Sequence, residues 1–219
     1  MATLKLTIVV LISGHGSNLQ AIIDEIDKDL PIQISAVISD QANAYGLTRA
    51  RQAGIKTTVV PAQDYPNRQA YDQALLTTIK QYQPELIVLS GFMRILGEVI
   101  IYHYTGKIIN IHPSLLPKFK GLHTYVQAIA AQEKHHGSSV HFVTAELDSG
   151  PIIAQSTLDI LADDSAETLK QRTQSLEHQL YPQVLRWFAE NSLHLSAEGI
   201  YKDNQLLTGP ISFTPKVNL

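Results

Sequence analysis

Residues 7–26 read TIVVLISGHGSNLQAIIDEI, and this stretch decides the fold. Its first part, TIVVLISG, is short, rich in β-branched residues and ends at glycine, which predicts a parallel strand buried on both faces. The second part has four aliphatic residues at helical spacing: Leu19, Ile22, Ile23 and Ile26. It predicts a helix, which Ser17 or Asn18 can cap. The first unit is therefore strand, glycine loop, helix.

Strands and helices alternate along the rest of the chain. Further strands are expected at 34–39, 56–60, 85–92, 107–112, 138–143 and 151–160. Helices are expected over 46–53, 68–81, 98–104, 125–132 and from Ser165 to about Ala189. The alternation predicts an α/β fold with a doubly wound, mostly parallel twisted sheet and a Rossmann-like N-terminal half. The late strands are candidates for an antiparallel edge of the sheet. Residues 193–209 are expected to form a small C-terminal hairpin. The whole chain, residues 1–219, is expected to form a single domain.

Composition excludes several functional classes. The 17 basic and 20 acidic side chains give a net charge of −3, so no broad cationic field favours nucleic acid or an anionic membrane surface. The absence of cysteine excludes disulfides, thiolate metal sites and a thiol nucleophile, and suits the cytoplasm. The apolar stretch from Ile8 to Ile12 is too short to span a bilayer and lacks the features of a signal peptide.

The loop GHGSN, residues 14–18, follows a predicted buried strand and opens a helix. Free N–H groups and the helix dipole make such a place favourable for a phosphate or carboxylate. It is a poor dinucleotide fingerprint, because Leu19 stands where G-x-G-x-x-G has its third glycine. The alternative is a tight turn that needs glycine for its backbone angles alone. The loop by itself does not decide between the two.

The strand KIINIH, residues 107–112, ends with Asn110 and His112, whose side chains point to the same side. Both can donate to one oxygen, at the carboxyl end of a strand where α/β proteins place their active sites. A lone histidine there is more often structural, and Asn110 shifts the interpretation toward chemistry. Asp148 follows the strand SSVHFV, where it can serve as a proton acceptor or simply form the turn DSGP.

Other chemistries fit less well. His135 and His136 are adjacent and diverge, and His141 alternates with its strand neighbours, so we interpret all three as surface or structural residues and expect no metal. Ser17 lies in GHGSN and not in the G-x-S-x-G of a hydrolase. Ser114, next to His112, remains a weak alternative nucleophile.

Taken together, these motifs resemble the glycinamide ribonucleotide formyltransferase family. The similarity runs from about Leu6 to Phe188 and rests on IVVLISGHGSNLQAII, ARQAGI, GFMRIL, NIHPSLLP, GLHT, GSSVHFVTAELDSGPII and EHQLYP. NIHPSLLP alone marks the wider superfamily that uses formyltetrahydrofolate. The resemblance implies a formyltransferase fold and transfer of the formyl group of 10-formyltetrahydrofolate to the amine of glycinamide ribonucleotide, a step of purine synthesis.

The resemblance also implies residue roles. It assigns catalysis to Asn110, His112 and Asp148. It assigns the ribonucleotide to Gly16, Ser17, Asn18, Gln174 and Glu177. It assigns the folate to Arg68, Met93, Arg94, Ile95, Leu96, Asn110, Thr144, Ala145, Glu146, Leu147 and Asp148. For Met93, Ile95 and Leu96 the alternative is ordinary core, and for Arg68 and Glu177 a solvated helix face.

Three alternatives remain open. A methionyl-tRNA formyltransferase carries an extra C-terminal RNA-binding domain, and a formyltetrahydrofolate hydrolase an extra N-terminal domain, for which this chain has no residues. A non-catalytic folate or nucleotide sensor on the same fold would not need Asn110, His112 and Asp148. The chain departs from the family pattern at four positions: His15, Lys120, Tyr125 and Val126.

Overall fold

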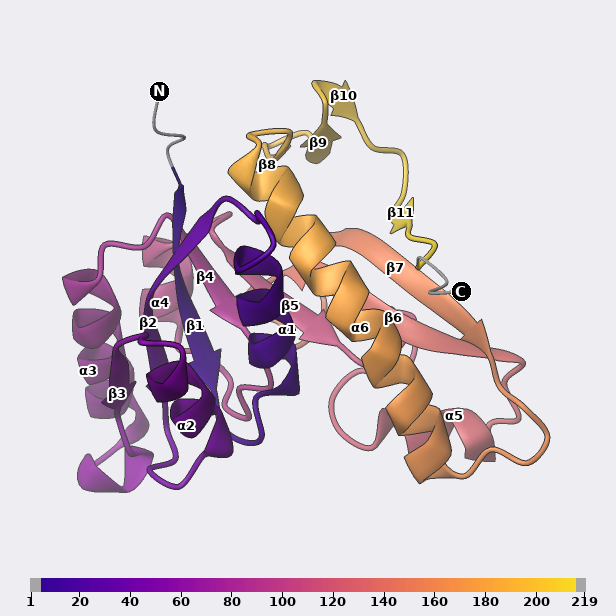
Figure 1. Cartoon of the computed structure of the whole chain (residues 1–219), viewed down its shortest axis with the longest axis horizontal. Coiled ribbons are helices and arrows are strands. Elements are labelled where there is room, and N and C mark those ends of the chain that lie inside the picture. Colours follow the sequence, from indigo (N-terminus) through magenta and orange to yellow (C-terminus); the bar gives the residue numbers. More distant parts are fainter. Residues whose placement is uncertain (1–4, 216–219) are drawn as a thin grey trace. The chain divides into compact units, whose positions relative to one another are not determined.

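The computed structural model describes residues 5–215 of the chain (Figure 1). It divides into two compact units, one ending at Asn110 and the other beginning at Ile111. Within residues 5–215, no helix combines the length and the apolar character that a membrane span requires.

The first unit is built on five parallel strands. They are β1 (Leu6–Ile12), β2 (Ile32–Ser39), β3 (Thr57–Val59), β4 (Leu86–Leu89) and β5 (Ile108–His112), the last of which continues into the second unit. The order of pairing is β3-β2-β1-β4-β5, and every pair is parallel. Residues 8–12 of β1 are completely buried, because neighbouring strands and helices enclose this aliphatic run.

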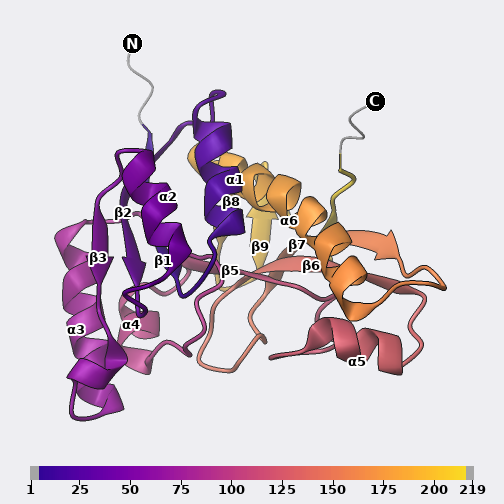
Figure 2. The ribbon, with the colours of Figure 1, turned by 60° about the horizontal axis from the view of Figure 1, so that its bottom comes forward.

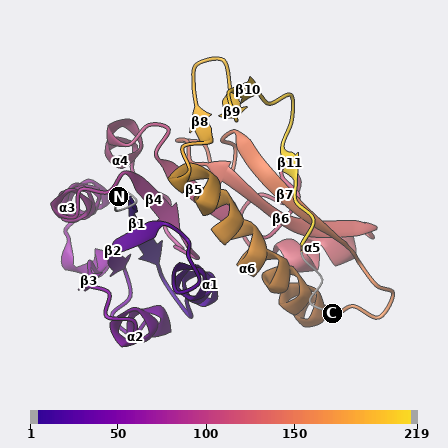
Figure 3. The same cartoon turned by 45° about the horizontal axis from the view of Figure 1, so that its top comes forward.

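Helices cover both faces of these strands. They are α1 (Ser17–Ile26), α2 (Tyr45–Gln52), α3 (Arg68–Gln81) and α4 (Glu98–His103), with a short 3₁₀ turn η1 (Ala62–Asp64). Helices α1 and α2 lie side by side (Figure 2), and α3 packs against α4. The two pairs lie on opposite faces of the sheet (Figure 3), so the predicted doubly wound arrangement is confirmed.

The start of α1 differs from the prediction. Gly16 is the N-cap, in the left-handed region at φ 73°, and no side chain caps the helix. Ser17 and Asn18 are already helical, so the prediction that either caps α1 is wrong. Glycine is needed because Gly46 at the start of α2 packs directly on the loop, and its N–H donates to the Gly14 carbonyl at 3.0 Å. A Cβ on Gly16 would lie 2.7 Å from the Gly46 Cα.

The second unit contains an antiparallel pair covered by a long helix. Its elements are α5 (Thr124–Ala130), β6 (His135–Phe142), β7 (Ile152–Asp159) and α6 (Ala166–Ala189). Strands β6 and β7 pair antiparallel, as expected of the late strands. Helix α6 packs along both (Figure 1) and starts with a capping box between Ser165 and Thr168. Within residues 5–215 parallel strand pairs outnumber antiparallel ones, so the predicted fold class is confirmed.

The C-terminal part contains the predicted hairpin and more. Strands β8 (Leu193–Leu195), β9 (Ile200–Lys202) and β10 (Gln205–Leu206) form a three-stranded antiparallel sheet. Strand β11 (Ile211–Ser212) then pairs parallel with β7. Two-residue strands carry too little alternation to be found from sequence.

Gly16 and Gly54 offer a matched test of the contact between the glycine loop and α2. Both have a left-handed φ, 73° and 71°, but a Cβ on Gly54 would meet nothing within 4 Å. Gly54→Ala is expected to lower the free energy of unfolding by about 1–2 kcal/mol, the cost of the left-handed backbone. Gly16→Ala is expected to cost about 1–3 kcal/mol more, because packed backbone must also move. Equal losses in urea unfolding would contradict the close contact.

Candidate active site

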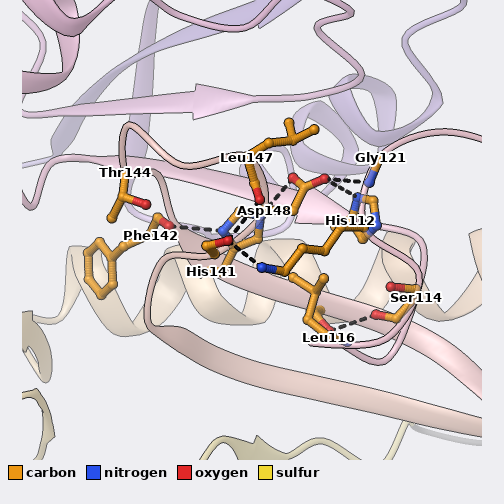
Figure 4. Close-up of polar contacts among 12 residues, drawn as sticks. His112, Ser114, Leu116, Gly121, His141, Phe142, Thr144, Leu147 and Asp148 are labelled. Atoms are coloured by element: carbon orange, nitrogen blue, oxygen red, sulfur yellow. Dashed lines mark hydrogen bonds and ion pairs between the residues drawn. The ribbon is translucent and has the colours of Figure 1, made fainter.

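His112 and Asp148 lie together in the second unit (Figure 4). The imidazole Nδ1 is 3.5 Å from the Asp148 Oδ2, and both side chains are almost completely buried. His112 is the last residue of β5, and Asp148 stands in the turn between β6 and β7. The pairing expected from the two strand ends is therefore present. Asn110 precedes His112 by two residues on β5 and is half-buried.

A carbonyl group fixes the second nitrogen of His112. The Phe119 carbonyl oxygen is 2.8 Å from Nε2 and can only accept, so Nε2 carries a hydrogen. Nδ1 is then the nitrogen that faces Asp148. The distance of 3.5 Å is longer than a charge-assisted hydrogen bond, so Nδ1 is not held by a short bond to the carboxylate.

Asp148 combines the two roles considered for it. Its φ is 46°, a left-handed turn conformation that Asp tolerates better than most residues. Its Oδ2 accepts a hydrogen bond at 2.9 Å from the N–H of Gly121, a residue far away in sequence. A mere turn-former would bond its own neighbours. The carboxylate is instead held beside an imidazole.

His141 is a site residue that the sequence interpretation missed. It lies near the end of β6, is 2% exposed, and places Nε2 at 3.6 Å from the Asp148 Oδ1. Burial is the main cause that lowers the pKa of His141, and this favours the neutral ring. Its Nδ1 then donates to the Phe142 carbonyl at 2.9 Å, and its bare Nε2 faces the carboxylate. Asp148 thus lies between two imidazoles, each near a different oxygen, in a position to hold or pass a proton.

The alternative nucleophile, Ser114, has another role. Its hydroxyl is fully buried and donates at 2.7 Å to the Lys118 carbonyl, within the loop that follows His112. It closes that loop and makes no hydrogen bond to an imidazole. The interpretation of Ser114 as a nucleophile is wrong.

The turn beside Asp148 is open to solvent. The four predicted folate residues Thr144, Ala145, Glu146 and Leu147 are exposed. Lys120, one of the departures from the family pattern, reaches across to this turn. Its ammonium group donates to the Ser149 hydroxyl and lies 3.6 Å from Glu146. The substitution therefore ties the loop after His112 to the turn that carries Asp148.

Glu177 lies inside the unit, so the solvated-face interpretation is wrong. It is 5% exposed and accepts a hydrogen bond from the Ser138 hydroxyl at 3.1 Å. Gln174 lies one turn earlier on the same side of α6 and is half-buried. Both predicted ribonucleotide residues of α6 therefore share one helix face.

The predicted anion loop lies in the first unit. Gly16 precedes the first turn of α1, which contains Ser17 and Asn18, and the N–H groups of a first helical turn have no partner within the helix. Arg49 on α2 braces this loop: its Nε donates to the His15 carbonyl at 3.0 Å. The His15 ring, the second departure from the family pattern, stacks on Tyr45 with centroids 5.3 Å apart.

The predicted folate residues of the first unit also lie near one another. The Arg68 guanidinium, at the start of α3, is 3.4 Å from the Ile95 carbonyl. Met93 and Ile95 are 67% and 53% exposed and so are not core, whereas Leu96 is buried. Arg94 is exposed and lies over the Tyr71 ring.

Two linked hydrogen bonds hold the segment of residues 93–96. The Met93 N–H donates to the Ser13 hydroxyl at 2.9 Å, and that hydroxyl donates to the buried Asp40 carboxylate at 2.5 Å. The end of β1 and the end of β2 thus position the residues after β4. The side chains of Met93 and Ile95 therefore remain exposed, although the backbone at Met93 is fixed by a hydrogen bond.

The three histidines of β6 do not converge. His135 is exposed and pairs with Asp159, His136 is buried, and His141 contacts Asp148. Among the described residues, no group of three or more His, Cys, Asp and Glu side chains is placed to hold a metal ion.

This arrangement, an imidazole at the end of a parallel strand beside a buried carboxylate, is suited to acyl transfer. A family model described as formyl transferase matches residues 6–185. The chain therefore belongs to the formyl transferase family. It is 48% identical over 203 residues to the phosphoribosylglycinamide formyltransferase of Escherichia coli (strain K12), covering 92% of this chain and 96% of that one.

Solved structures give the same result. A phosphoribosylglycinamide formyltransferase from Coxiella burnetii superposes with a TM-score of 0.92 at 51% identity, covering 96% of this chain and 100% of that one. A glycinamide ribonucleotide transformylase from Symbiobacterium toebii gives a TM-score of 0.87 at 42% identity, covering 90% and 94%. The resemblance stated from the sequence, and the assignment of the chain to the transferases, are confirmed.

Buried His136 predicts an acid-sensitive stability. Burial, the largest cause, lowers its pKa to about 4, against an opposing hydrogen bond to the Pro113 backbone. Below about pH 6.5 the unfolded chain binds a proton that the native imidazole refuses. The contribution to the free energy of unfolding is full above pH 6.5 and falls by up to about 3 kcal/mol as the pH approaches 4.

Urea unfolding at several pH values between 7 and 4 checks this. His136→Gln is expected to lose stability less steeply with acid than the wild type. His135→Gln, at the exposed neighbour, serves as the control and should keep the wild-type slope. Parallel curves for the wild type and His136→Gln would contradict the assignment.

Proposed function

We propose that the protein transfers the formyl group of 10-formyltetrahydrofolate to the amine of glycinamide ribonucleotide. The observation that carries the proposal is the near-complete match to phosphoribosylglycinamide formyltransferases, which covers 96% of the Escherichia coli relative. The buried pair of His112 and Asp148 supports it, because that pair offers a donor and a proton acceptor side by side. The proposal implies 10-formyltetrahydrofolate as co-substrate and small-molecule substrates, with no metal, nucleic acid or membrane. The single-domain organisation and the cytoplasmic location stay predictions.

In the proposed mechanism the amine attacks the formyl carbon, and negative charge develops on the formyl oxygen. Asn110 and the Nδ1–H of protonated His112 donate to that oxygen. The fixed bond from Nε2 to the Phe119 carbonyl keeps Nδ1 in the reacting position. The nitrogen of the attacking amine loses a proton and the folate nitrogen gains one when the C–N bond to the folate breaks.

Asp148 is proposed to organise this proton movement. Its Oδ2 faces His112, and its Oδ1 faces the neutral His141. A carboxylate between two imidazoles can accept the amine proton, directly or through a water molecule, and return it. Positioning of both substrates next to each other supplies much of the remaining rate enhancement.

We assign the binding roles from two features described above, the start of α1 and the exposed apolar residues. For the ribonucleotide phosphate we propose the helix start at Gly16, Ser17 and Asn18, where N–H groups and the helix dipole favour an anion. Its other groups would meet Gln174 and Glu177. For the folate we propose the exposed apolar residues Met93, Ile95 and Leu147. The other proposed folate residues are Arg94, Leu96, Thr144, Ala145 and Glu146, with Arg68 for the glutamate tail.

A comparison of formyl acceptors tests the proposed function. Purified protein with 10-formyltetrahydrofolate is expected to formylate glycinamide ribonucleotide with a kcat/KM far above that for initiator methionyl-tRNA. The net charge of −3 gives no field to attract RNA. Comparable values would restore the tRNA alternative. Release of formate without an acceptor would indicate a hydrolase, and binding without turnover a sensor.

Asp148→Asn separates the catalytic from the turn-forming role. Asn tolerates the φ of 46° and its carbonyl can still accept from Gly121, so the melting temperature should change little. Loss of the proton acceptor should lower kcat about a hundredfold or more. Dissociation constants of both substrates should stay near wild type. A variant that binds, melts and turns over like wild type would leave Asp148 a structural residue.

A further inference from the structure

We propose that Ser139 and Gln155 are positioning residues for the His112–Asp148 pair, which they orient through the loop of residues 113–121. The inference rests on the proposed function of that pair. Neither side chain touches His112 or Asp148 in a hydrogen bond of the structure. They act through their hydrogen bonds to the backbone of Ser114 and Leu116.

The loop of residues 113–121 gives the pair its two backbone contacts. The Phe119 carbonyl accepts from Nε2 of His112, and the Gly121 N–H donates to Oδ2 of Asp148. Both loop residues have a positive φ, 54° and 78°. A left-handed residue other than glycine costs about 1–2 kcal/mol, so the loop needs bonds elsewhere to keep this path.

The hydroxyl of Ser139 on β6 is the first of these bonds. It donates at 2.7 Å to the Ser114 carbonyl, and accepts at 3.0 Å from the Leu116 N–H and at 2.8 Å from Gln155. One donated and two accepted bonds are all that a hydroxyl can make. Ser139 is completely buried, so water cannot replace it.

The amide of Gln155 on β7 completes the anchor. Its Nε2 donates to the Ser139 hydroxyl at 2.8 Å and to the Leu116 carbonyl at 2.9 Å. The two side chains thus take both backbone polar groups of Leu116, a buried residue with no strand partner of its own. A segment outside the sheet is thus joined to β6 and β7 by side-chain hydrogen bonds.

The anchor is connected to Phe119 by a short tight turn. The Ser114 hydroxyl donates to the Lys118 carbonyl at 2.7 Å, and the Lys118 N–H donates to Leu115 at 3.1 Å. Phe119 follows at once. A shift of Leu116 is therefore transmitted over three residues to the Phe119 carbonyl. That carbonyl accepts from Nε2 of His112 and so sets the position of Nδ1.

This arrangement predicts a particular kinetic defect. Loss of the anchor misaligns the imidazole, whereas the long side chain of Lys120, which links the loop to Glu146 in the exposed turn of residues 144–147, can follow a small shift of the loop backbone. The kcat should fall while the KM values for both substrates stay close to wild type. Small misplacements of catalytic groups reduce rates by about ten- to a hundredfold.

Two variants and one matched control test the proposal. Ser139→Ala and Gln155→Met remove the anchoring hydrogen bonds and keep most of the side-chain volume. Ser156→Ala is the control: its hydroxyl is equally buried, lies on β7 next to Gln155, and has no hydrogen-bond partner among the described residues. Both anchor variants are expected to lose about tenfold or more in kcat, with KM changed less than about threefold. Ser156→Ala should keep both constants.

The pH titration of the His112 ring, followed by ¹⁵N NMR, gives a readout that needs no substrate. The chain has nine histidines, so His112→Asn identifies the resonance by its absence. The titration should move in Ser139→Ala and Gln155→Met and stay unchanged in Ser156→Ala. Because both side chains act on Leu116, the double variant should be little worse than the worse single one.

The outcomes separate this inference from the proposed function. A wild-type protein without formyl transfer would remove the proposed function, and the NMR titration would still test the anchor. Anchor variants with wild-type kcat and an unmoved titration would overturn the inference, as would an equal loss in Ser156→Ala. If Ser139→Ala fails to fold, the half-buried Gln155 still provides the test.

Discussion

The carboxylate of Asp148 is almost fully buried, and burying a charge is costly unless it is paired and hydrogen-bonded. The Gly121 N–H donates a hydrogen bond to the carboxylate, His112 pairs with it when protonated, and the neutral His141 lies against its second oxygen. Each comes from a different segment: the end of β5, the end of β6 and the loop after His112. The burial of this one carboxylate therefore brings three segments of the second unit together.

The same requirement explains why the loop after β5 is held by side chains of the sheet. A loop with no strand partner has backbone groups that still need hydrogen bonds once they are buried. Ser139 and Gln155 supply them on one side, and Ser114 supplies one within the loop. The chemistry at His112 is thus set by backbone atoms of Phe119 and Gly121, whose positions depend on residues that never contact a reacting atom.

The sequence was sufficient for the fold and for the central pair because both follow from strong local patterns. Buried aliphatic strands, the glycine loop and the proline after His112 are visible in any short window, and the order of strands then places His112 and Asp148 at neighbouring ends. His141 was missed because alternation along a strand gives the side of a residue and not what lies opposite it. Its contact with Asp148 arises only when the turn folds back. The prediction of the α1 cap was wrong for a similar reason. Gly16 is required by its contact with Gly46, which is distant in sequence.

The proposed direct transfer agrees with how the hydroxyl and imidazole groups are used. A covalent mechanism through serine needs its hydroxyl to donate to a base that is itself free to accept. Ser114 donates to a carbonyl, and Nε2 of His112 carries a hydrogen toward Phe119, so neither half of such a relay is present. The one ring nitrogen left for chemistry, Nδ1, faces a carboxylate and becomes a donor when protonated. A donor at this position can stabilise an oxyanion, which agrees with the role proposed for His112, the polarisation of a formyl group that another bound molecule attacks.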